Sequence, residues 1–433
     1  MLDIRFIREH PERVAEASNQ KGYAVDVSHL LELDAQRRDL QSAVDELRAR
    51  RNDNASKMKG GKPDQALIDE GKQIKITLAE REGYLTAVEA EYGTLLKTVP
   101  NMLLDDVPVG ASEDENVITK TVGKVPTFDF APKNHAEIAE ARGWMDKQRA
   151  AKVAGARFAY VKGDLAKLHF ALVQYGISVL TDESTLAKIA EGAGLTGRVS
   201  LRPFTLVLPP LMIRTEAYDA MDRLEPREDR YKIEGEDLWL QGSAEHVLGS
   251  MHADEILAET DLPIRYVGYA TSFRREAGTY GKDMEGIFRM HQFDKLEMES
   301  LTTPEQSLDE HLFMIAIQEY LMQQLALPYQ LIMKCTADIG KPNARGVDID
   351  TWLPAQGKYR ETHTADYMTD YQSRRLKTKF RRDDGEVELV HTNDATVLSQ
   401  RPLIAIIENY QTADGQIQVP EVLRPYLGGR NLL

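Results

Sequence analysis

The chain has 433 residues, of which 42% are apolar and 28% are charged, and its formal net charge is −15. This length predicts two or more domains, and the acidic balance excludes non-specific coating of nucleic acid by the whole surface. A single cysteine, Cys335, excludes internal disulfides and thiolate metal clusters and favours a reducing, cytoplasmic location. No run of about 18 apolar residues and no secretory signal is found, so we predict neither a membrane span nor export.

Heptad patterns in the first hundred residues predict a pair of long helices. Upstream, leucines recur every seven residues, at Leu33, Leu40 and Leu47. Beyond a helix-breaking turn at 60–63, a second seam alternates by fours and threes, interrupted by a glycine and an arginine: Leu67, Gly71, Ile74, Leu78, Arg81, Leu85, Val88, Tyr92 and Leu95. We therefore expect an antiparallel α-helical coiled-coil arm over about residues 28–98 of an N-terminal domain, residues 1–100.

The expected tip of this arm is rich in basic residues. Six of them lie near the turn, against a single aspartate: Arg48, Arg50, Arg51, Lys57, Lys59 and Lys62. A charge run is usually a solvated helix end, but the end of an arm on an acidic protein also suits contacts with nucleic-acid phosphates. The residues alone leave both interpretations open.

After the arm, proline, glycine and acidic residues predict a connector over residues 101–134. Residues 135–433 mix strand-like runs, at 204–208 and 264–269, with helical stretches such as 305–325. Strands in irregular order with helices between them favour an α+β domain around a mostly antiparallel β-sheet with flanking helices.

Four polar clusters in this domain point to chemistry. The first pairs FRREAG (273–278) with FRMHQFDKLE (288–297), and a strand–loop–strand arrangement would set Arg274 and Arg289 on adjacent strands. Two guanidinium groups side by side suit a polyphosphate. Glu297 could then accept hydrogen bonds from a nearby ammonium group, although a surface hairpin with cross-strand ion pairs explains the same residues.

Two further clusters are weaker on residue types alone. Glu361 and Thr364, a carboxylate and a hydroxyl three residues apart, could ligate Mg²⁺ through oxygen. Ser243 and Glu245, two residues apart, would share one strand face and meet a small polar ligand. In isolation, an ordinary strand end is the better explanation of the first pair, and the second pair alone is a very weak signal.

The fourth cluster, HTNDAT (391–396), precedes Arg401 and an apolar, helix-like run over 403–407. The P-loop and Rossmann fingerprints are both missing, so neither of those modes of nucleotide binding is predicted. The histidines lack the spacing of metal ligands, so we expect no protein-held zinc.

Together the clusters resemble the class II aminoacyl-tRNA synthetases, and the whole chain is similar to the seryl-tRNA synthetase family. The resemblance to motif 2 lies in FRREAG and FRMHQFDKLE, and that to motif 3 in RPLIAIIENYQ (401–411). The segment VLPP (207–210) resembles the end of motif 1, which builds the dimer interface in this family. Further similar segments are CTADIG, DIDTWLPAQGKYRE, DYQSRR and the tail VPEVLRPYLGG. The resemblance implies a class II catalytic domain over 135–433, a homodimer, and a cytoplasmic, ATP-dependent serine–tRNA ligase.

The resemblance also implies roles at the nucleotide. Arg274 would hold the ATP α-phosphate and the charge that develops in adenylate formation, while Arg289 and Arg401 would hold the terminal phosphates. Glu276 would contact the adenine side of the nucleotide, and Phe293 would stack on the base. Among the residues implied at ATP, Arg274, Glu276 and Arg401 would be catalytic, and Glu361 and Thr364 would also bind Mg²⁺. The full set implied at ATP is Arg274, Arg275, Glu276, Arg289, Phe293, Glu361, Thr362, His363, Thr364 and Arg401.

Serine and the RNA substrate are implied as well. The residues expected around serine are Ser243, Ala244, Glu245, Glu297 and Thr396, and their paired donors and acceptors would reject alanine. tRNA(Ser), with tRNA(Sec) left open as a second RNA, would bind through the arm at Arg48, Arg50, Arg51, Lys57 and Lys59. No enzyme nucleophile is needed, because the serine carboxylate attacks phosphorus and catalysis is mainly positioning and charge stabilisation.

Several positions depart from the common bacterial pattern of the family. Ser243 stands where threonine is usual, and Ala337 stands where glycine is usual. Motif 3 begins TNDATVLSQR instead of a sequence like LNGSGLAVGR, so aligning forward from His391 selects Thr396 as the serine contact, whereas aligning back from Arg401 selects Ala395. We prefer Thr396 because a hydroxyl-binding pocket needs a polar group.

Two alternatives compete with an active synthetase. A ligase that loads amino acids onto a carrier protein would lack the arm predicted over 28–98. An inactive paralogue that binds tRNA would be expected to lose the phosphate-holding arginines or Glu361, and all of them are present.

Overall fold

The computed structural model describes residues 1–60, 64–276 and 286–433. Most of the turn predicted at 60–63, including Lys62, and the loop predicted between the two motif 2 segments lie outside these ranges. The chain forms two compact units, Met1–Met102 and Leu103–Leu433. Within the described ranges, no helix combines the length and the apolar character needed to cross a lipid bilayer.

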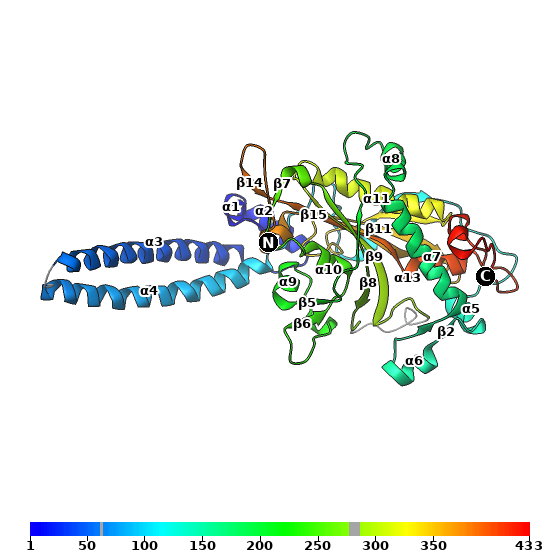
Figure 1. Ribbon diagram of the computed structural model, residues 1–433, viewed down its shortest axis with the longest axis horizontal. Coiled ribbons are helices and arrows are strands. Elements are labelled where there is room, and N and C mark those ends of the chain that lie inside the picture. Colours follow the sequence, from blue (N-terminus) through cyan, green and yellow to red (C-terminus); the bar gives the residue numbers. More distant parts are fainter. Residues whose placement is uncertain (61–63, 277–285) are drawn as a thin grey trace. The chain divides into compact units, whose positions relative to one another are not determined.

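The first unit contains the predicted helical hairpin (Figure 1). Its helices are α1 (Ile4–Glu9), α2 (Pro11–Gln20), α3 (Val27–Lys57) and α4 (Gln65–Thr98). Aspartates cap both long helices: Asp26 accepts a hydrogen bond from the backbone N–H of His29, and Asp64 accepts one from that of Ala66. The expected pair of long antiparallel helices is confirmed.

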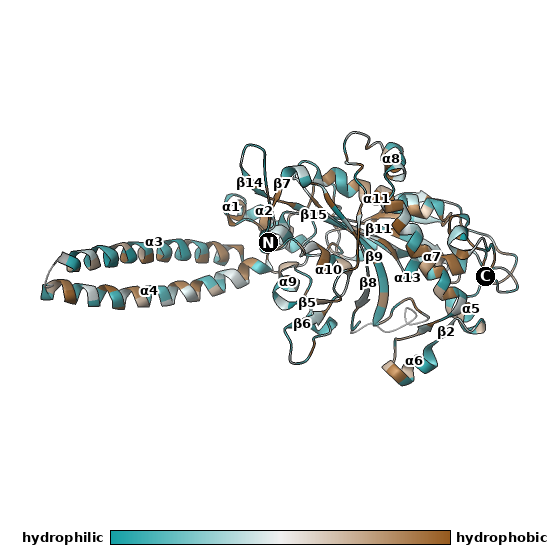
Figure 2. Cartoon of the chain, viewed as in Figure 1, coloured by the Kyte–Doolittle hydropathy of each residue, from teal (hydrophilic) through white to brown (hydrophobic). Residues whose placement is uncertain are grey.

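Apolar side chains from both predicted seams meet between α3 and α4. Val44, Leu78 and Leu85 are buried there, and Leu40 and Leu47 pack against them. Figure 2 shows hydrophobic residues recurring along both helices. The hairpin therefore has its own apolar contact surface, as heptad spacing requires.

The two interruptions of the second seam have different explanations. Gly71 allows a close approach of the helices, because a Cβ atom there would meet the Asn54 side chain at 2.9 Å. Asn54 is buried, and its amide donates to the backbone carbonyl of Leu67 at 3.1 Å. A polar residue of this kind helps to fix the register of paired helices. Arg81, by contrast, is exposed.

An eight-stranded sheet organises the second unit, in the order β1-β10-β11-β12-β15-β9-β8-β4. All of its pairings are antiparallel except the one between β4 and β8, so the expected sheet type is confirmed. The strands are β1 (Val117–Val122), β4 (Thr205–Val207), β8 (Ile264–Phe273), β9 (Gln292–Thr302), β10 (Tyr329–Met333), β11 (Arg345–Leu353), β12 (Lys358–Thr369) and β15 (His391–Ser399). Strand β1 comes from the segment expected to be a connector.

Helices and short strands complete this unit. Its helices are α5 (His135–Ala141), α6 (Lys147–Ala154), α7 (Gly163–Leu180), α8 (Glu183–Gly192), α9 (Thr215–Ala220), α10 (Ala244–Gly249), α11 (Ser307–Gln324), α12 (Tyr371–Leu376) and α13 (Gln400–Asn409). The short strands are β2 (Met145–Asp146), β3 (Tyr160–Val161), β5 (Met212–Arg214), β6 (Leu238–Leu240), β7 (Ile256–Ala258), β13 (Lys379–Arg381) and β14 (Val387–Leu389). The strands predicted at 204–208 and 264–269 and the helices predicted at 305–325 and 403–407 correspond to β4, β8, α11 and α13.

The two faces of the large sheet differ in chemistry. Helices α7, α11 and α13 bury a continuous apolar core against one face (Figure 1). Along β15, Ala395 and Val397 belong to this core, whereas Asp394 and Thr396 line a pocket. Successive side chains of a strand point to opposite faces, so the pocket occupies the polar face of the sheet.

Candidate active site

A pocket of about 380 Å³ lies on the polar face of the sheet, and all four predicted clusters contribute to it. The predicted residues in its lining are Glu245, Arg274, Glu276, Arg289, Phe293, Glu297, Glu361, Thr362, Thr364, Thr396 and Arg401. Segments far apart in the sequence thus meet at one concave site that is rich in charged groups, which is the usual character of an active site.

Arg274 and Arg289 lie just beyond the paired part of β8 and β9. The prediction that both sit within paired strands is wrong, because the pairing ends at Phe273 and Gln292. Arg289 forms an ion pair with Glu276. The φ angle of Glu276 is 50°, a left-handed conformation that a non-glycine residue adopts only where its surroundings hold it. The two arginines thus reach the pocket from irregular segments.

Aromatic rings and guanidinium groups alternate in the same part of the pocket. The guanidinium of Arg274 lies 5.2 Å from the ring centre of Phe293. Phe288 has two such neighbours, Arg360 at 4.5 Å and Arg401 at 5.1 Å. Flat rings can stack on a purine, and guanidinium groups bind phosphate oxygens, so this arrangement suits a nucleoside polyphosphate.

Glu361 and Thr364 line the same pocket although they are three residues apart on β12. Regular alternation would send them to opposite faces of the sheet. A β-bulge resolves this conflict, because Thr362 has no partner residue in the pairing with β11. The bulge brings a carboxylate and a hydroxyl to one side of the strand.

Arg401, the second residue of α13, holds Glu361 in its ionised form. Its guanidinium lies 2.9 Å from the Glu361 carboxylate. The Glu361 side chain is 48% exposed. The surrounding protein acts to raise its pKa, but the charges of Arg401 and then Lys334 outweigh this and lower it to about 2. An ionised carboxylate beside the Thr364 hydroxyl can ligate a hard cation such as Mg²⁺ through oxygen.

A second group of polar residues comes from α10, β9 and β15. Lys295 donates to the Glu297 carboxylate at 2.8 Å. The Thr396 hydroxyl donates to Glu297 across the β9–β15 pair at 3.5 Å, and the Ser243 hydroxyl donates to Glu245 at 3.0 Å. This group offers ionic and hydroxyl partners to a small polar ligand.

The prediction that Ser243 and Glu245 share a strand face is wrong. Ser243 is the N-cap of α10, and Glu245 lies in the first turn of that helix. The Ser243 hydroxyl makes no capping bond to the backbone of α10 and donates to Glu245 instead. Ser243 and Ala244 are fully buried next to Glu245 and are not part of the pocket lining.

The register of β15 distinguishes between the two possible serine contacts. Ala395 belongs to the apolar core and pairs with Met298 of β9. Thr396 lines the pocket and pairs with Glu297. Only the threonine can therefore meet a ligand in this pocket.

Burial sets the protonation of the two glutamates in different ways. It raises the pKa of Glu297 to about 7, in spite of the attraction of Lys295. It acts in the same direction on Glu245, but a hydrogen bond from His246 and the charges of Lys295 and Arg223 hold the pKa of that carboxyl well below its usual range. Burial lowers the pKa of His246 itself to about 4. Near neutral pH, Glu245 is thus ionised and Glu297 titrates.

Two residues expected at the nucleotide lie elsewhere. The guanidinium of Arg275 lies 6.0 Å from the ring centre of Tyr231, and Arg275 is not part of the pocket lining. His363 is buried, and its Nε2 lies 3.1 Å from the carbonyl oxygen of Val397. Burial lowers the pKa of His363 to about 4, which suits a neutral ring inside the fold.

Sequence reasoning missed a central cation, Arg223. It lies in the loop after α9, and its guanidinium is 3.3 Å from Glu245, 3.6 Å from Asp366 and 3.6 Å from Asp394. No local pattern marks such a loop residue, since its partners are fixed only by the fold.

Three other missed residues carried a local signal. Lys295 is two residues from Glu297, Asp366 is two from Thr364, and Asp394 is two from Thr396, and all of them line the pocket. On a strand, residues two apart share a face. A search two residues before and after each predicted contact on a strand would have found these three residues.

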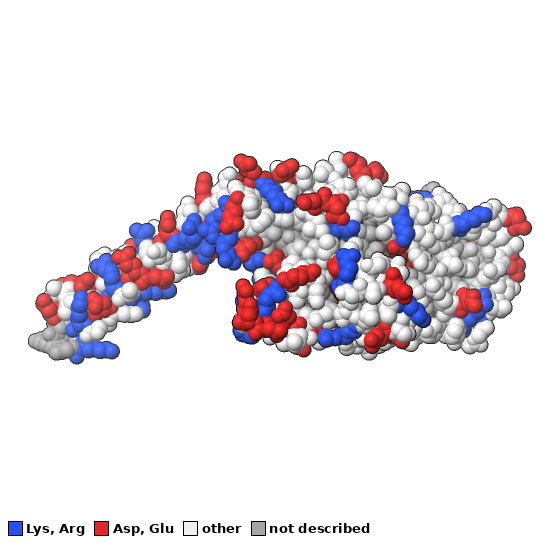
Figure 3. Space-filling model, turned by 90° about the horizontal axis from the view of Figure 1, so that it is seen from above, with Lys and Arg blue, Asp and Glu red and all other residues white. Residues whose placement is uncertain are grey.

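The basic residues expected at the tip of the arm are exposed, and three of them are ion-paired. The pairs are Arg48–Glu82 at 2.8 Å, Arg50–Glu70 at 3.7 Å and Lys57–Asp53 at 2.6 Å. Arg51 and Lys59 are exposed as well. Figure 3 shows basic and acidic side chains interspersed along this helical unit. The tip is therefore a mixed surface and not a purely basic one.

Comparison with known protein families gives two matches. The family of seryl-tRNA synthetase N-terminal domains matches residues 1–103, and the tRNA synthetase class II core domain (G, H, P, S and T) matches residues 229–410. Curated relatives include the serine–tRNA ligases of Nitrosopumilus maritimus, 37% identical over 99% of each chain, and of Cenarchaeum symbiosum, 40% identical over 99% of each chain.

Solved structures are similar over the whole chain. The seryl-tRNA synthetase from Pyrococcus horikoshii, complexed with ATP, has a TM-score of 0.88 and 35% identity and covers 100% of this chain and 99% of its own. The cytoplasmic serine–tRNA ligase from Naegleria fowleri, in complex with AMP, has a TM-score of 0.84 and 28% identity, with 100% and 98% covered.

Proposed function

The chain belongs to the seryl-tRNA synthetase family, and from this premise we propose how its residues join L-serine to tRNA(Ser) with ATP. First, a carboxylate oxygen of serine attacks the α-phosphorus of ATP, the bond to the bridging oxygen breaks, and pyrophosphate leaves with the electron pair. Then a ribose hydroxyl at the 3′ end of the tRNA attacks the seryl carbonyl, the bond from the carbonyl carbon to the phosphate oxygen breaks, and AMP leaves with the electron pair while a phosphate oxygen of AMP takes the hydroxyl proton. The reaction forms no covalent bond to the enzyme.

The phosphates of ATP bind to the arginines of the pocket. Arg274 contacts the α-phosphate, where charge develops during adenylate formation, and Arg289 and Arg401 contact the terminal phosphates. Glu276 contacts the adenine side of the nucleotide and Phe293 stacks on the base. The ring contacts of Arg274 with Phe293 and of Arg401 with Phe288 support this assignment, because they set cations beside flat surfaces.

Glu361 and Thr364 bind Mg²⁺ together with the nucleotide. Oxygen ligands are what this ion prefers, and Glu361 is ionised at neutral pH, so these residues suit it. Bound there, the ion would neutralise phosphate charge. Arg401, 2.9 Å from Glu361, would position the carboxylate beside the phosphates that it binds itself.

Serine binds at the other polar group. The carboxylates of Glu245 and Glu297 bind the serine ammonium, and Thr396 is a partner of the serine hydroxyl. A site that pairs a buried hydroxyl rejects alanine, because the polar groups of the site would lose their partners. Ser243 supports Glu245 through its 3.0 Å hydrogen bond, and the small Ala244 lets α10 pack close to the sheet.

The remaining residues expected at ATP, Thr362, His363 and Arg275, hold their neighbours in position. Thr362 donates to the carbonyl of Ile349 at 3.0 Å and contacts the ring of His363 at 2.9 Å, which holds the bulge that presents Glu361. Arg275 packs on Tyr231 at the edge of the motif 2 segment.

The coiled-coil arm binds tRNA(Ser) through Arg48, Arg50, Arg51, Lys57 and Lys59, and charging of tRNA(Sec) is a separate question for the same assay. Exposed ion pairs contribute little stability, so phosphate oxygens can replace their carboxylates at small cost.

The active form is a cytoplasmic homodimer joined near Pro209. Exposed apolar residues beside the edge strand β4 support this interface: Leu206, Leu208, Leu211 and Met212.

The convergence of phosphate-binding and hydroxyl-binding residues in one pocket carries this proposal. A carrier-protein ligase is not favoured, because the N-terminal arm is present. A paralogue without activity is not favoured either, because Arg274, Arg289, Glu361 and Arg401 all line the pocket.

Amino-acid-dependent exchange between ATP and labelled pyrophosphate tests the first step. We expect exchange with serine and little with threonine, alanine or glycine. Exchange with none of them, by protein that binds ATP, would overturn the proposal.

A further inference from the structure

Acidic residues form a row across three neighbouring strands of the sheet. Asp394 of β15 pairs in register with Asp366 of β12 on one side and with Glu299 of β9 on the other. Directly opposed residues on one face of a sheet have Cβ atoms about 5 Å apart, and like charges in such pairs repel. Three carboxyl groups in one buried row need a compensating positive charge or protons.

The cations in contact with this row are too few to balance it. Glu245 and Glu297 lie beside the row, and among the described residues these five carboxyl groups form ion pairs with Arg223 and Lys295. The charge of Lys334 acts on Asp366 without an ion pair to it. His246 also touches Glu245, but burial lowers the pKa of its ring to about 4 and leaves it neutral. The five carboxyl groups therefore outnumber Arg223, Lys295 and Lys334 by two when all are ionised.

Two carboxyl groups of the cluster have oxygens that accept no hydrogen bond from the described residues. Glu299 is fully buried, and within the described residues neither of its oxygens has a hydrogen-bond partner. Asp394 is 2% exposed, and its Oδ2 likewise makes no hydrogen bond there. Burial, and after it the neighbouring carboxylates, raise the pKa of both groups well above the usual range. Unsatisfied buried carboxyls of this kind are costly unless a ligand completes them.

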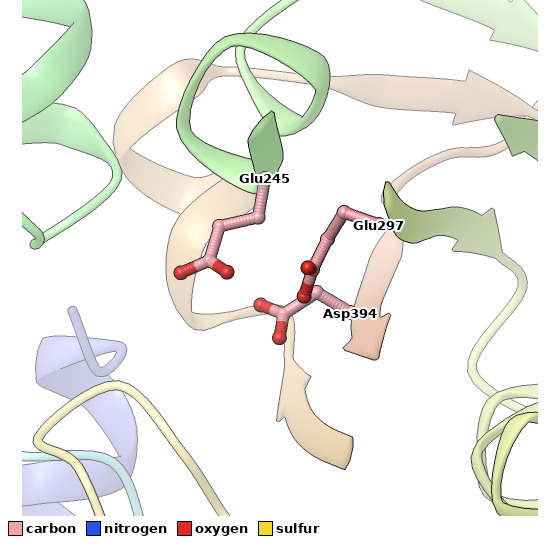
Figure 4. Close-up of side chains that lie close together, drawn as sticks. All are labelled: Glu245, Glu297 and Asp394. Atoms are coloured by element: carbon pink, nitrogen blue, oxygen red, sulfur yellow. The ribbon is translucent and has the colours of Figure 1, made fainter. Parts of the chain in front are cut away.

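The geometry fits a compact cation. Oxygens of Glu245, Glu297 and Asp394 lie within 4.8 Å of one another, and Figure 4 shows the three carboxylates pointing toward a common space. An ammonium nitrogen about 2.8 Å from three oxygens in tetrahedral directions separates those oxygens by about 4.6 Å. The spacing thus suits an amino group, and all three residues line the pocket.

We propose that this pocket binds and activates, besides serine, a small amino acid that carries a side-chain ammonium group where serine has its hydroxyl, L-2,3-diaminopropionate being the simplest. The α-ammonium of serine supplies one of the missing positive charges, and the side-chain ammonium supplies a second next to Asp394. The chemistry is that of serine activation: a substrate carboxylate oxygen attacks the α-phosphorus, and pyrophosphate leaves. This inference rests on the proposed function, since it concerns the same pocket and the same first step.

Pyrophosphate exchange with L-serine, L-2,3-diaminopropionate and L-alanine tests the inference. We expect the diamino acid to support exchange well above the level with alanine. Asp394→Asn keeps the size of the side chain but cannot ionise beside an ammonium group, and it should lower the ratio of kcat/KM for the diamino acid to kcat/KM for serine by about tenfold to a hundredfold. Glu299→Gln should lower the same ratio, and Asp383→Asn, in an exposed loop, is the matched control that should leave it unchanged.

Each other outcome has one meaning. Exchange with serine but none with the diamino acid overturns this inference and leaves the proposed function standing. Exchange with neither overturns the proposed function. A ratio that does not fall in Asp394→Asn or Glu299→Gln also overturns the inference. Stoichiometric Mn²⁺ binding without nucleotide, detected by electron paramagnetic resonance and lost in Asp394→Asn, would assign the site to a metal ion instead.

Discussion

The helical arm and the catalytic pocket use charged residues in opposite ways. In the arm, Arg48 and Glu82 form an exposed pair at 2.8 Å, and an apolar seam holds the helices together. In the pocket, Lys295 and Glu297 form a pair at the same distance, but Glu297 is 1% exposed and burial raises its pKa to about 7. An ion pair of the same length is thus a replaceable surface contact in the arm, whereas in the pocket it helps to set the protonation of a residue at the active site.

Because the pocket charges act on the chemistry, removing one pocket cation should have the largest effect on serine activation. Arg274→Ala should reduce serine-dependent pyrophosphate exchange by about 10²–10³-fold, because the lost contact is made to charge that develops in the transition state. Arg381→Ala, at the exposed last residue of β13, is the matched control. Near wild-type exchange in Arg274→Ala would show that the pocket charges are not catalytic.

Titration of the pocket should give the next largest effect. Glu297 is protonated below about pH 7 and gains its negative charge above it. The ionised form attracts the serine ammonium, so kcat/KM for serine should rise with pH and level off above about 7, by about tenfold per unit on the acid side. Saturating ATP and a range of buffers from pH 5.5 to about 9 would resolve this. A flat profile through pH 7 would contradict the role of Glu297.

In the arm, an apolar substitution should matter more than any single charge. Leu78→Ala removes a buried side chain from the seam and should destabilise the hairpin by about 2–3 kcal/mol. Ile76→Ala, at a site that is 54% exposed on the same helix, should change stability by less than about 0.5 kcal/mol. Amide hydrogen exchange of α3 and α4 in the full chain measures both. Equal effects of the two changes would mean that the helices do not pack through this seam.

Charge removal at the tip should have the smallest effect. Replacing Arg48, Arg50 and Arg51 with alanine should raise KM for tRNA several-fold and lower the slope of its logarithm against salt by about two to three units. KM for serine and ATP should not change. Aminoacylation kinetics at several salt concentrations measure the slope, and an unchanged slope would remove these residues from the RNA interface.

The arm could be predicted from sequence because its determinants are local. A heptad seam repeats within one helix, and even the break at Gly71 marks a real feature, the close approach to Asn54. The strands and helices with strong patterns, such as β8 and α11, could be predicted for the same reason.

The pocket could be predicted only in part because its determinants are not local. The motif residues are correct as a set, but the bulge at Thr362 decides which of them face the ligand. Ser243 stands at the start of α10, where a strand was expected. Arg223 and the row through Asp394 depend on cross-strand register and loop placement, which no single segment encodes.

Adenylation belongs to the pocket and RNA recognition to the arm, so deletion of residues 28–98 should separate the two activities. Both activities should be measured on the same protein: serine-dependent pyrophosphate exchange and serylation of tRNA(Ser). The account predicts exchange within about threefold of the full chain and no detectable serylation. Loss of exchange with tRNA binding retained would contradict it.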